Sequence, residues 1–265
     1  MTLVTQISPV ATGLSQERPV VCVEHLAKSY GGPQILRDVS FTLQKGVSLA
    51  IIGANGSGKS TLLKTLIRLT EPSAGGIRIL DQDVCALSGG ALRRFRSRLG
   101  VVWQRHNLVP RLCALSNVVH GVQSRQSGMR SWWQSIAPQA VRAEALECLD
   151  RVGMADFALR RVDSLSGGQS QRVAIARMLM QRPELILADE PDASLDPQSG
   201  EDVMRLLSDL ARQQGISLIF VSHRLEHTLQ FSDQILGLLG GELTLNLPTS
   251  AAHAEQLRRF FETEE

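Results

Sequence analysis

Short apolar runs and helix-like spacings alternate along most of this chain. Short apolar runs bounded by polar or turn-forming residues predict β-strands. Such runs occupy residues 20–23, 41–43, 47–52, 77–80, 99–103, 185–188, 216–222, 235–239 and 242–247. Apolar residues that recur every three or four positions predict helices at residues 60–69, 141–152, 169–180 and 251–265. The alternation of strands with helices predicts an α/β fold.

The same pattern predicts how the chain is divided. Residues 185–188 are all apolar, and residues 216–222 are apolar apart from Ser217 and Ser222, which is typical of parallel strands covered on both faces. From residue 105 the sequence pattern becomes that of helices separated by polar segments. This pattern predicts a helical insertion at about residues 105–180. We therefore expect one domain at residues 20–247 that contains this insertion. It is preceded by a flexible polar tail at residues 1–19 and followed by a C-terminal helix at 248–265.

Composition narrows the classes of protein that fit. The 265 residues are 43% apolar and 20% charged, enough for a large domain with an ordinary core. The net charge of +2 is too small to favour a nucleic-acid partner. No apolar stretch reaches the ~18 residues that a membrane helix needs, and no signal peptide is visible, so any work at a membrane requires docking onto a spanning protein. The four cysteines are scattered, which favours reduced thiols over a metal site.

Residues 53–60 read Gly-Ala-Asn-Gly-Ser-Gly-Lys-Ser and lie between a predicted strand and a predicted helix. Glycines let successive backbone N–H groups converge, and the helix that follows adds its positive end, so the segment suits a phosphate. Lys59 can reach the β- and γ-phosphates, and the Ser60 hydroxyl can ligate Mg²⁺. The flanking strand and helix disfavour the alternative of a chance glycine-rich turn. The segment therefore predicts a nucleotide site.

Polar residues that follow the strands predict the hydrolytic chemistry. Asp189 and Glu190 end a buried strand, at the edge where parallel sheets bind ligands. Asp189 would hold Mg²⁺, and Glu190 would orient and deprotonate the attacking water. The amide of Gln104 could touch both metal and water, and His223 could sense the γ-phosphate, although a lone histidine is more often packed or solvated. Tyr30 could stack on adenine; the alternative is a loop tyrosine packed on the sheet.

Residues 165–169 read Leu-Ser-Gly-Gly-Gln and predict a second anion site. Ser166 suits a helix N-cap, and the N–H groups of Gly167, Gly168 and Gln169 would then be exposed. Because one phosphate loop already holds a nucleotide, we expect this segment to close over the nucleotide of a second copy in a two-fold dimer. A plain helix start is the alternative for these five residues taken alone. Within one copy the two half-sites should lie apart.

The motifs described above, taken in their order along the chain, resemble those of ABC-transporter ATPase subunits. The resemblance covers about residues 20–247. The resemblance implies a P-loop NTPase fold with a RecA-like core, an antiparallel β subdomain and a helical subdomain, and it implies ATP and Mg²⁺ as cofactors. It implies Glu190 as catalytic base, His223 as switch histidine and Gln104 as Q-loop residue. It implies a D-loop at residues 194–196. The implied ligand-contacting residues are Tyr30 for adenine, Gly53, Ala54, Asn55, Gly56, Ser57, Gly58, Lys59, Ser60, Thr61, Ser166, Gly167, Gly168 and Gln169 for ATP, and Ser60, Gln104 and Asp189 for Mg²⁺.

Residues 103–112, Trp-Gln-Arg-His-Asn-Leu-Val-Pro-Arg-Leu, resemble the corresponding text of phosphonate-importer ATPases. This resemblance implies the ATP-hydrolysing subunit of an importer for phosphonates, phosphite or hypophosphite. It implies a homodimer that lies on the cytoplasmic face of the inner membrane and binds permease subunits. It also implies an indirect partner, a periplasmic substrate-binding protein, and no nucleic-acid partner. Trp132 and Trp133 would lie near the permease contact, with simple core packing as the alternative.

Three departures from that subfamily leave the substrate open. They are Asn55, Asp192 where an apolar residue is usual, and Arg-Leu-Glu-His at residues 224–227. An ABC transporter for another solute, such as phosphate or amino acids, remains the main alternative. A soluble ABC ATPase acting on DNA or ribosomes is less favoured, because the chain has one cassette, no heptad array and no Cys-x-x-Cys pair.

Overall fold

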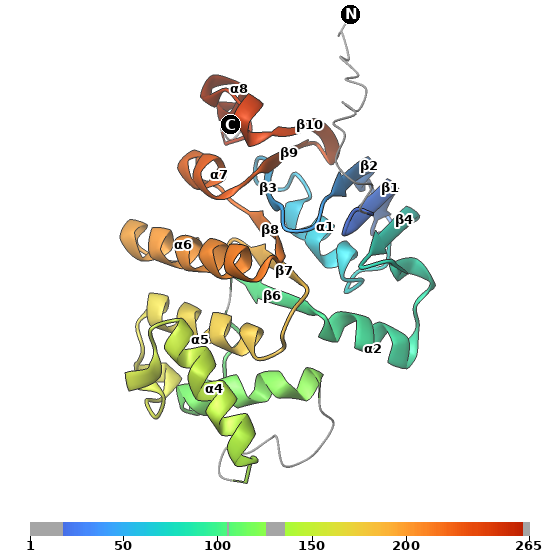
Figure 1. Ribbon diagram of the computed structural model, residues 1–265. Helices are drawn as coiled ribbons and strands as arrows, with labels where there is room; N and C mark the ends of the chain where they lie inside the picture. The colour runs from blue at the N-terminus through green and yellow to red at the C-terminus, as the bar shows by residue number, and fades with distance from the viewer. Residues whose placement is uncertain (1–17, 105, 126–135, 262–265) are drawn as a thin grey trace, which may run out of the picture.

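The computed structural model describes residues 18–104, 106–125 and 136–261, and Figure 1 shows their elements. Within these residues the strands form one sheet in the order β5-β4-β1-β2-β10-β9-β3-β8-β7-β6. The bounds of the strands are β1 Val21–Ser29, β2 Gln34–Leu43, β3 Ser48–Ile52, β4 Ala74–Ile79, β5 Gln82–Asp83, β6 Leu99–Trp103, β7 Leu185–Asp189, β8 Ser217–Val221, β9 Gln234–Leu239 and β10 Glu242–Pro248.

The sheet has a parallel half and an antiparallel half. Strands β9, β3, β8, β7 and β6 pair with one another in parallel. Strands β1, β2, β4 and β5 pair antiparallel, and β10 pairs antiparallel with β9. Every residue of β7 and β8 is buried, as their largely apolar sequences predict. The predicted fold class, a parallel core with an antiparallel subdomain, is confirmed.

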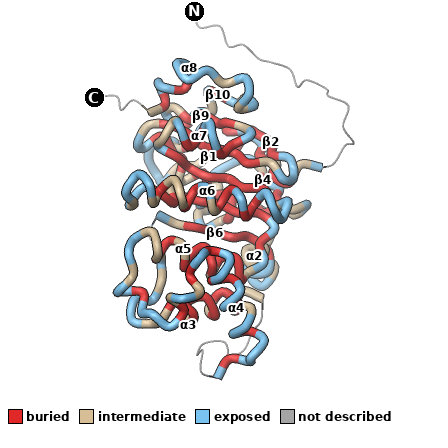
Figure 2. Tube along the Cα trace, turned by 60° about the vertical axis from the view of Figure 1, so that its left-hand side comes forward, coloured by how far each residue is buried: buried red, intermediate tan, exposed pale blue. Residues whose placement is uncertain are grey.

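The helices cover the sheet and extend beyond one edge of it. Figures 1 and 2 show α4 and α5 grouped beyond β6, at the edge of the parallel half. This group, together with α3, occupies the stretch in which the sequence predicts a helical insertion. The helix bounds are α1 Lys59–Leu66, α2 Gly89–Ser97, α3 Ala114–Val119, α4 Gln139–Arg151, α5 Gly167–Leu179, α6 Pro197–Gln214, α7 Leu225–Phe231 and α8 Ala254–Arg258.

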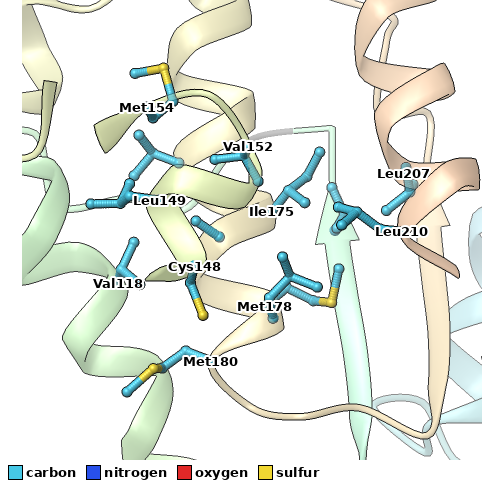
Figure 3. Close-up of a cluster of buried hydrophobic side chains, with 14 of the residues drawn as sticks. Val118, Cys148, Leu149, Val152, Met154, Ile175, Met178, Met180, Leu207 and Leu210 are labelled. Carbon is cyan, nitrogen blue, oxygen red and sulfur yellow. The ribbon is translucent and has the colours of Figure 1, made fainter. Parts of the chain in front are cut away.

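Adjacent residues of β7 contribute to two different cores, because successive strand side chains point to opposite faces. Ile186 packs in a cluster with Leu207 of α6, and this cluster continues into the helices beyond β6. Figure 3 shows the middle of that cluster, where α4, α5 and α6 meet. Leu187 packs on the other face, in a cluster with Leu63 of α1 and the antiparallel strands. The sheet is thus held between two apolar layers.

Strands β1 and β2 are longer than the apolar runs in their sequence predict. The sequence predicts strands at residues 20–23 and 41–43, whereas the structure has Val21–Ser29 and Gln34–Leu43. The pairing of these two strands shifts register several times, and His25 and Asp38 have left-handed backbone angles, φ 49° and φ 50°. These irregularities break the alternation of apolar and polar residues on which the prediction depends.

The C-terminal helix is shorter than the predicted 251–265 stretch. Helix α8 spans Ala254–Arg258 and follows a 3₁₀ turn at Thr249–Ala251. Leu257 and Phe260 are fully buried against Ile235, which fixes this segment on the core. Residues 1–17 of the tail predicted at 1–19 lie outside the described residues, as do Trp132 and Trp133, so the expectations about them stay predictions. Among the described helices, none combines the length and apolar character that crossing a bilayer requires.

Candidate nucleotide-binding and hydrolysis site

The predicted phosphate loop joins β3 to α1, and two of its glycines are required by close contacts. A Cβ added to Gly53 would lie 2.4 Å from the carbonyl oxygen of Leu238. A Cβ added to Gly58 would lie 2.9 Å from Leu36, and Gly58 has a left-handed φ of 102°. A side chain at Gly53 would clash with the backbone, and one at Gly58 would be strained by its left-handed conformation, so both positions require glycine.

Lys59 lies buried across this loop. Its Nζ donates hydrogen bonds to the carbonyl oxygens of Gly53 at 2.8 Å and Ala54 at 2.9 Å. Burial lowers the pKa of Lys59, and the charges of Glu190 and Asp189 oppose that shift. Carbonyl dipoles are weaker partners for an ammonium than a phosphate is, so the lysine is placed to exchange these contacts for an anion.

Ser60 and Asp189 bring two oxygen donors together from distant parts of the chain. The Ser60 hydroxyl, in the first turn of α1, donates to Oδ1 of Asp189 at the end of β7 across 2.9 Å. Burial raises the pKa of Asp189, while the hydrogen bond from Ser60 lowers it. Mg²⁺ prefers oxygen ligands and commonly takes one or two from protein and the rest from water and phosphate. The donor set therefore fits Mg²⁺.

Glu190 and His223 form a close pair at the same edge of the sheet. Strands β7 and β8 run parallel with Asp189 opposite Val221, so the residues that follow the two strands meet. The Nε2 of His223 lies 2.6 Å from Oε1 of Glu190. The hydrogen bond with His223 lowers the pKa of Glu190, so the carboxylate form is favoured. Glu190 also has a left-handed φ of 49°, a conformation that few non-glycine residues adopt.

A pocket opens between the phosphate loop and Glu190. It is lined by Ile35, Asn55, Gly56, Gly58, Lys59, Ser60, Thr61 and Glu190. Ser57 lies between the lining residues Gly56 and Gly58. Its Oγ is buried and has no hydrogen-bond partner in the described part of the chain. An unsatisfied buried hydroxyl in a loop of this shape is consistent with a polar ligand. Ile35, at the start of β2, was not among the predicted site residues, because nothing in the local text relates it to the loop.

Gln104 and Tyr30 do not line this pocket. Gln104 is exposed and directly follows β6, whose last residue, Trp103, pairs with Asp189. No hydrogen bond in the described residues joins Gln104 to the carboxylates. Tyr30 is 59% exposed and its hydroxyl lies 3.4 Å from Thr70 Oγ1, beyond the end of α1. The ammonium of Lys28 lies 4.6 Å from the centroid of the Tyr30 ring, so the stacking role of Tyr30 stays a prediction.

The segment at residues 165–169 forms the start of α5. Ser166 is the N-cap: its Oγ accepts the Gln169 N–H at 3.2 Å, and the Gln169 side chain accepts the Ser166 N–H at 3.0 Å. A Cβ added to Gly167 would lie 3.1 Å from Leu195, and one added to Gly168 would lie 3.3 Å from Ser199. The two glycines thus allow the predicted D-loop and the start of α6 to approach closely. None of these signature residues lines the phosphate pocket.

Arg177 is a structural link that the sequence did not reveal. From α5 it donates to the carbonyl oxygens of Asn107 at 2.7 Å and His106 at 3.0 Å. These contacts attach the segment that follows Gln104 to the helix that begins with the signature. The only local signal is an arginine on the inward side of an apolar-spaced helix.

Sequence comparison agrees with this geometry. Residues 36–193 match the family model described as ABC transporter. The chain is 43% identical over 258 residues to the phosphonates import ATP-binding protein of Nitratidesulfovibrio vulgaris, covering 97% of each chain. It is 42% identical over 244 residues to the phosphite import ATP-binding protein of Stutzerimonas stutzeri, covering 91% of this chain and 87% of the relative.

Solved structures give the same result for the fold. A dimeric ATP-binding cassette in a post-hydrolysis state with ADP and Pi has a TM-score of 0.76 and 33% identity, covering 86% of this chain and 98% of that one. The cbiO1 protein of Clostridium perfringens, part of an ABC transporter complex, has a TM-score of 0.80 and 26% identity, covering 91% and 93%. With the phosphate loop, the carboxylate edge and the Leu-Ser-Gly-Gly-Gln helix start all in place, this chain belongs to the ABC transporter family, as an ATP-hydrolysing cassette.

Proposed function

We propose that this chain is the ATPase subunit of an ABC importer that takes up phosphonates or a related reduced-phosphorus oxyanion. The observation that carries the proposal is the convergence of two pairs at one sheet edge, Ser60 with Asp189 and Glu190 with His223. The first pair suits the metal and phosphates, and the second suits the attacking water. The cargo follows from relatives named for phosphonate and phosphite import.

In the proposed mechanism, Lys59 and the N–H groups of the phosphate loop bind the β- and γ-phosphates. Ser60 and Asp189, with Gln104 as the third proposed ligand, would hold Mg²⁺, which would offset charge on the phosphates. Glu190 accepts a proton from water as the water oxygen bonds to the γ-phosphorus and the bond to ADP breaks. His223 holds Glu190 in place and contacts the γ-phosphate. Tyr30 offers its exposed ring to adenine.

Two copies are proposed to complete the site. The pocket is lined by the phosphate loop, Ile35 and Glu190. The lining includes none of Ser166, Gly167, Gly168 or Gln169. In a two-fold dimer, these residues of one copy would cover the nucleotide held by the other. A dimeric cassette is among the structures that this chain resembles, which supports the arrangement.

The permease subunits are proposed to dock on the groove between the sheet and the helices beyond β6. It is lined in part by Ile67, Leu69, Trp103, Gly121 and Met178, and Leu69 is 55% exposed. The exposed Leu69 and the half-buried Trp103 offer apolar surface in this groove for a protein contact. This docking would place the chain at the cytoplasmic face of the inner membrane, with a periplasmic binding protein delivering the solute on the other side.

The proposal is tested by growth and by binding. A strain lacking this gene should fail to grow on at least one of a phosphonate, phosphite or hypophosphite as sole phosphorus source, yet grow on phosphate. The wild-type gene should restore growth, and a Lys59→Ala gene should not. Purified Lys59→Ala protein should lose ATP binding. Equal growth of the deletion strain on all sources would refute the cargo, and unchanged ATP affinity would refute the role of Lys59.

A further inference from the structure

A second carboxylate–imidazole pair lies behind the Glu190–His223 pair. The Oδ2 of Asp192 is 2.8 Å from Nδ1 of His227. Asp192 is two residues beyond Glu190, and His227 is four beyond His223, so both pairs connect the same two segments. Glu190 of the first pair lines the phosphate pocket, whereas both residues of the second pair are buried. Asp192 and His227 are also positions at which the sequence departs from the phosphonate subfamily.

The environment of the second pair gives its polar atoms few alternatives. Asp192 and His227 are each 4% exposed. The Nδ1 of His227 is close to the carboxylate but not in line for a regular hydrogen bond, and it has no other partner in the described residues. Arg224 adds a cation, with Nε 3.7 Å from the same Oδ2. Burying a carboxylate is costly unless it is paired, so separating these segments would leave Asp192 unpaired.

The pair sits where three elements meet. A Cβ added to Gly200, in α6, would lie 3.3 Å from Cβ of Asp192, so the loop after β7 is pressed against α6. His227 belongs to α7 and packs edge-on against Phe231, with ring centroids 5.6 Å apart. The loop that carries Glu190 is therefore fixed on one side by α6 and on the other by the Asp192–His227 contact.

We propose that Asp192 and His227 are positioning residues for ATP hydrolysis, which hold the α7 segment against the Glu190 loop and thereby keep His223 in contact with Glu190. This inference rests on the roles proposed above for Glu190 and His223. Neither Asp192 nor His227 lines the phosphate pocket, so their effect is on the rate of hydrolysis and not on ATP binding.

Two substitutions of His227 separate positioning from packing. His227→Leu fills the space but removes the polar atom, whereas His227→Asn leaves a gap but keeps a donor near the place of Nδ1. We expect His227→Leu to lower kcat about tenfold or more, His227→Asn to stay within about threefold of wild type, and the KM for ATP to change less than about twofold in both. A packing role predicts the reverse order, and that result would overturn the proposal.

A double variant tests whether the effect passes through His223. In a His223→Ala background, His227→Leu should lower kcat by less than about twofold further, because the contact it positions is already gone. If the double variant instead lost kcat by the product of the two single-variant factors, the proposal would be overturned. Arg205→Gln, which breaks the exposed Glu201–Arg205 pair on α6, is the matched control and should leave kcat unchanged.

Folding and activity are checked on the full-length purified chain. Thermal unfolding shows whether each variant is folded, and Asp192→Ala probes the same contact from the other end if His227→Leu does not fold. Asp192→Ala should then lower kcat about tenfold, and a wild-type kcat would overturn the proposal. An inactive wild-type chain would refute the proposed function, whereas an active wild type with a fully active His227→Leu variant refutes only this inference.

Discussion

Glu190 is positioned as a base by features at the scale of single residues. It follows the last residue of β7, adopts φ 49°, and contacts His223 at 2.6 Å. Glu190→Gln keeps the shape and removes the proton acceptor, so we expect kcat to fall about 10²- to 10⁴-fold while ATP still binds. The variant should also trap the closed dimer, visible by size-exclusion chromatography with ATP. Hydrolysis at the wild-type rate would show that another group is the base.

Cys148 gives a second expectation at this scale. Figure 3 shows it within the apolar cluster of the helical layer, and burial raises the pKa of its thiol to about 11. The thiolate is the reactive form, and an ordinary value is 9.0, so its population at pH 8 is about 100-fold lower than for an unperturbed thiol. In the folded chain, a thiol reagent should modify Cys22, Cys85 or Cys113 well before Cys148, as mass spectrometry can show. Early labelling of Cys148 would contradict its burial.

The residues found from sequence are those whose neighbours in the chain identify them. Lys59, Asp189 and Glu190 stand in short motifs beside a strand or helix, and the structure brings them to one edge. Ile35 and Arg177 carry no such local signal, because their contacts join segments far apart in the chain. Asp192 departs from the sequence pattern of phosphonate-importer ATPases. Its contact with His227 depends on how α7 packs, which the local sequence does not encode.

At the scale of elements, the strands of the parallel half were predicted best. Strands β6 to β8 are apolar except for Asp189 at the end of β7 and Ser217 at the start of β8, and they closely match their predicted bounds. Helix α6 was missing from the prediction, although its ends carry clear signals: Pro197 in the first turn, Asp196 as N-cap and Gly215 with φ 63° after the last turn. The buried Val203, Leu207 and Leu210 also recur at helical spacing, so both the caps and the apolar pattern of this segment mark a helix.

The link between α2 and β7 yields a pH-dependent prediction. Arg98, at the end of α2, donates to both carboxylate oxygens of Glu184 at 2.5 Å and 2.8 Å, and this lowers the pKa of Glu184 from 4.5. A lowered folded pKa means that the stabilisation is complete above 4.5 and is lost as pH falls through the folded pKa. Because Glu184 is half-exposed, Glu184→Gln should cost about 0.5 kcal/mol at pH 7.

Urea unfolding of wild type and Glu184→Gln at several pH values measures this link. The difference in unfolding free energy should be largest near neutral pH and should shrink below pH 4.5. Arg98→Gln should cause a similar loss at pH 7, since it removes the other partner. A difference that grows as pH falls would contradict the assigned direction.

At the scale of the whole molecule, the separation of the two half-sites leads to a prediction about assembly. Lys59 lines the phosphate pocket and Ser166 does not, so each complete site is proposed to take Lys59 from one copy and Ser166 from the other. Lys59→Ala and Ser166→Arg should each abolish hydrolysis when every copy in the dimer carries the change. In a mixed dimer, both defects fall in one site, and the other site has an intact Lys59 and an intact Ser166.

Mixing the two inactive variants should therefore restore activity. At equal concentrations about half of the dimers are mixed if copies exchange at random, and each has one intact site, so ATPase activity should reappear above that of either variant alone. A chain carrying both substitutions, mixed with Lys59→Ala, is the control, because none of its combinations contains an intact site. If instead each chain used its own Ser166, the mixture would stay as inactive as its parts.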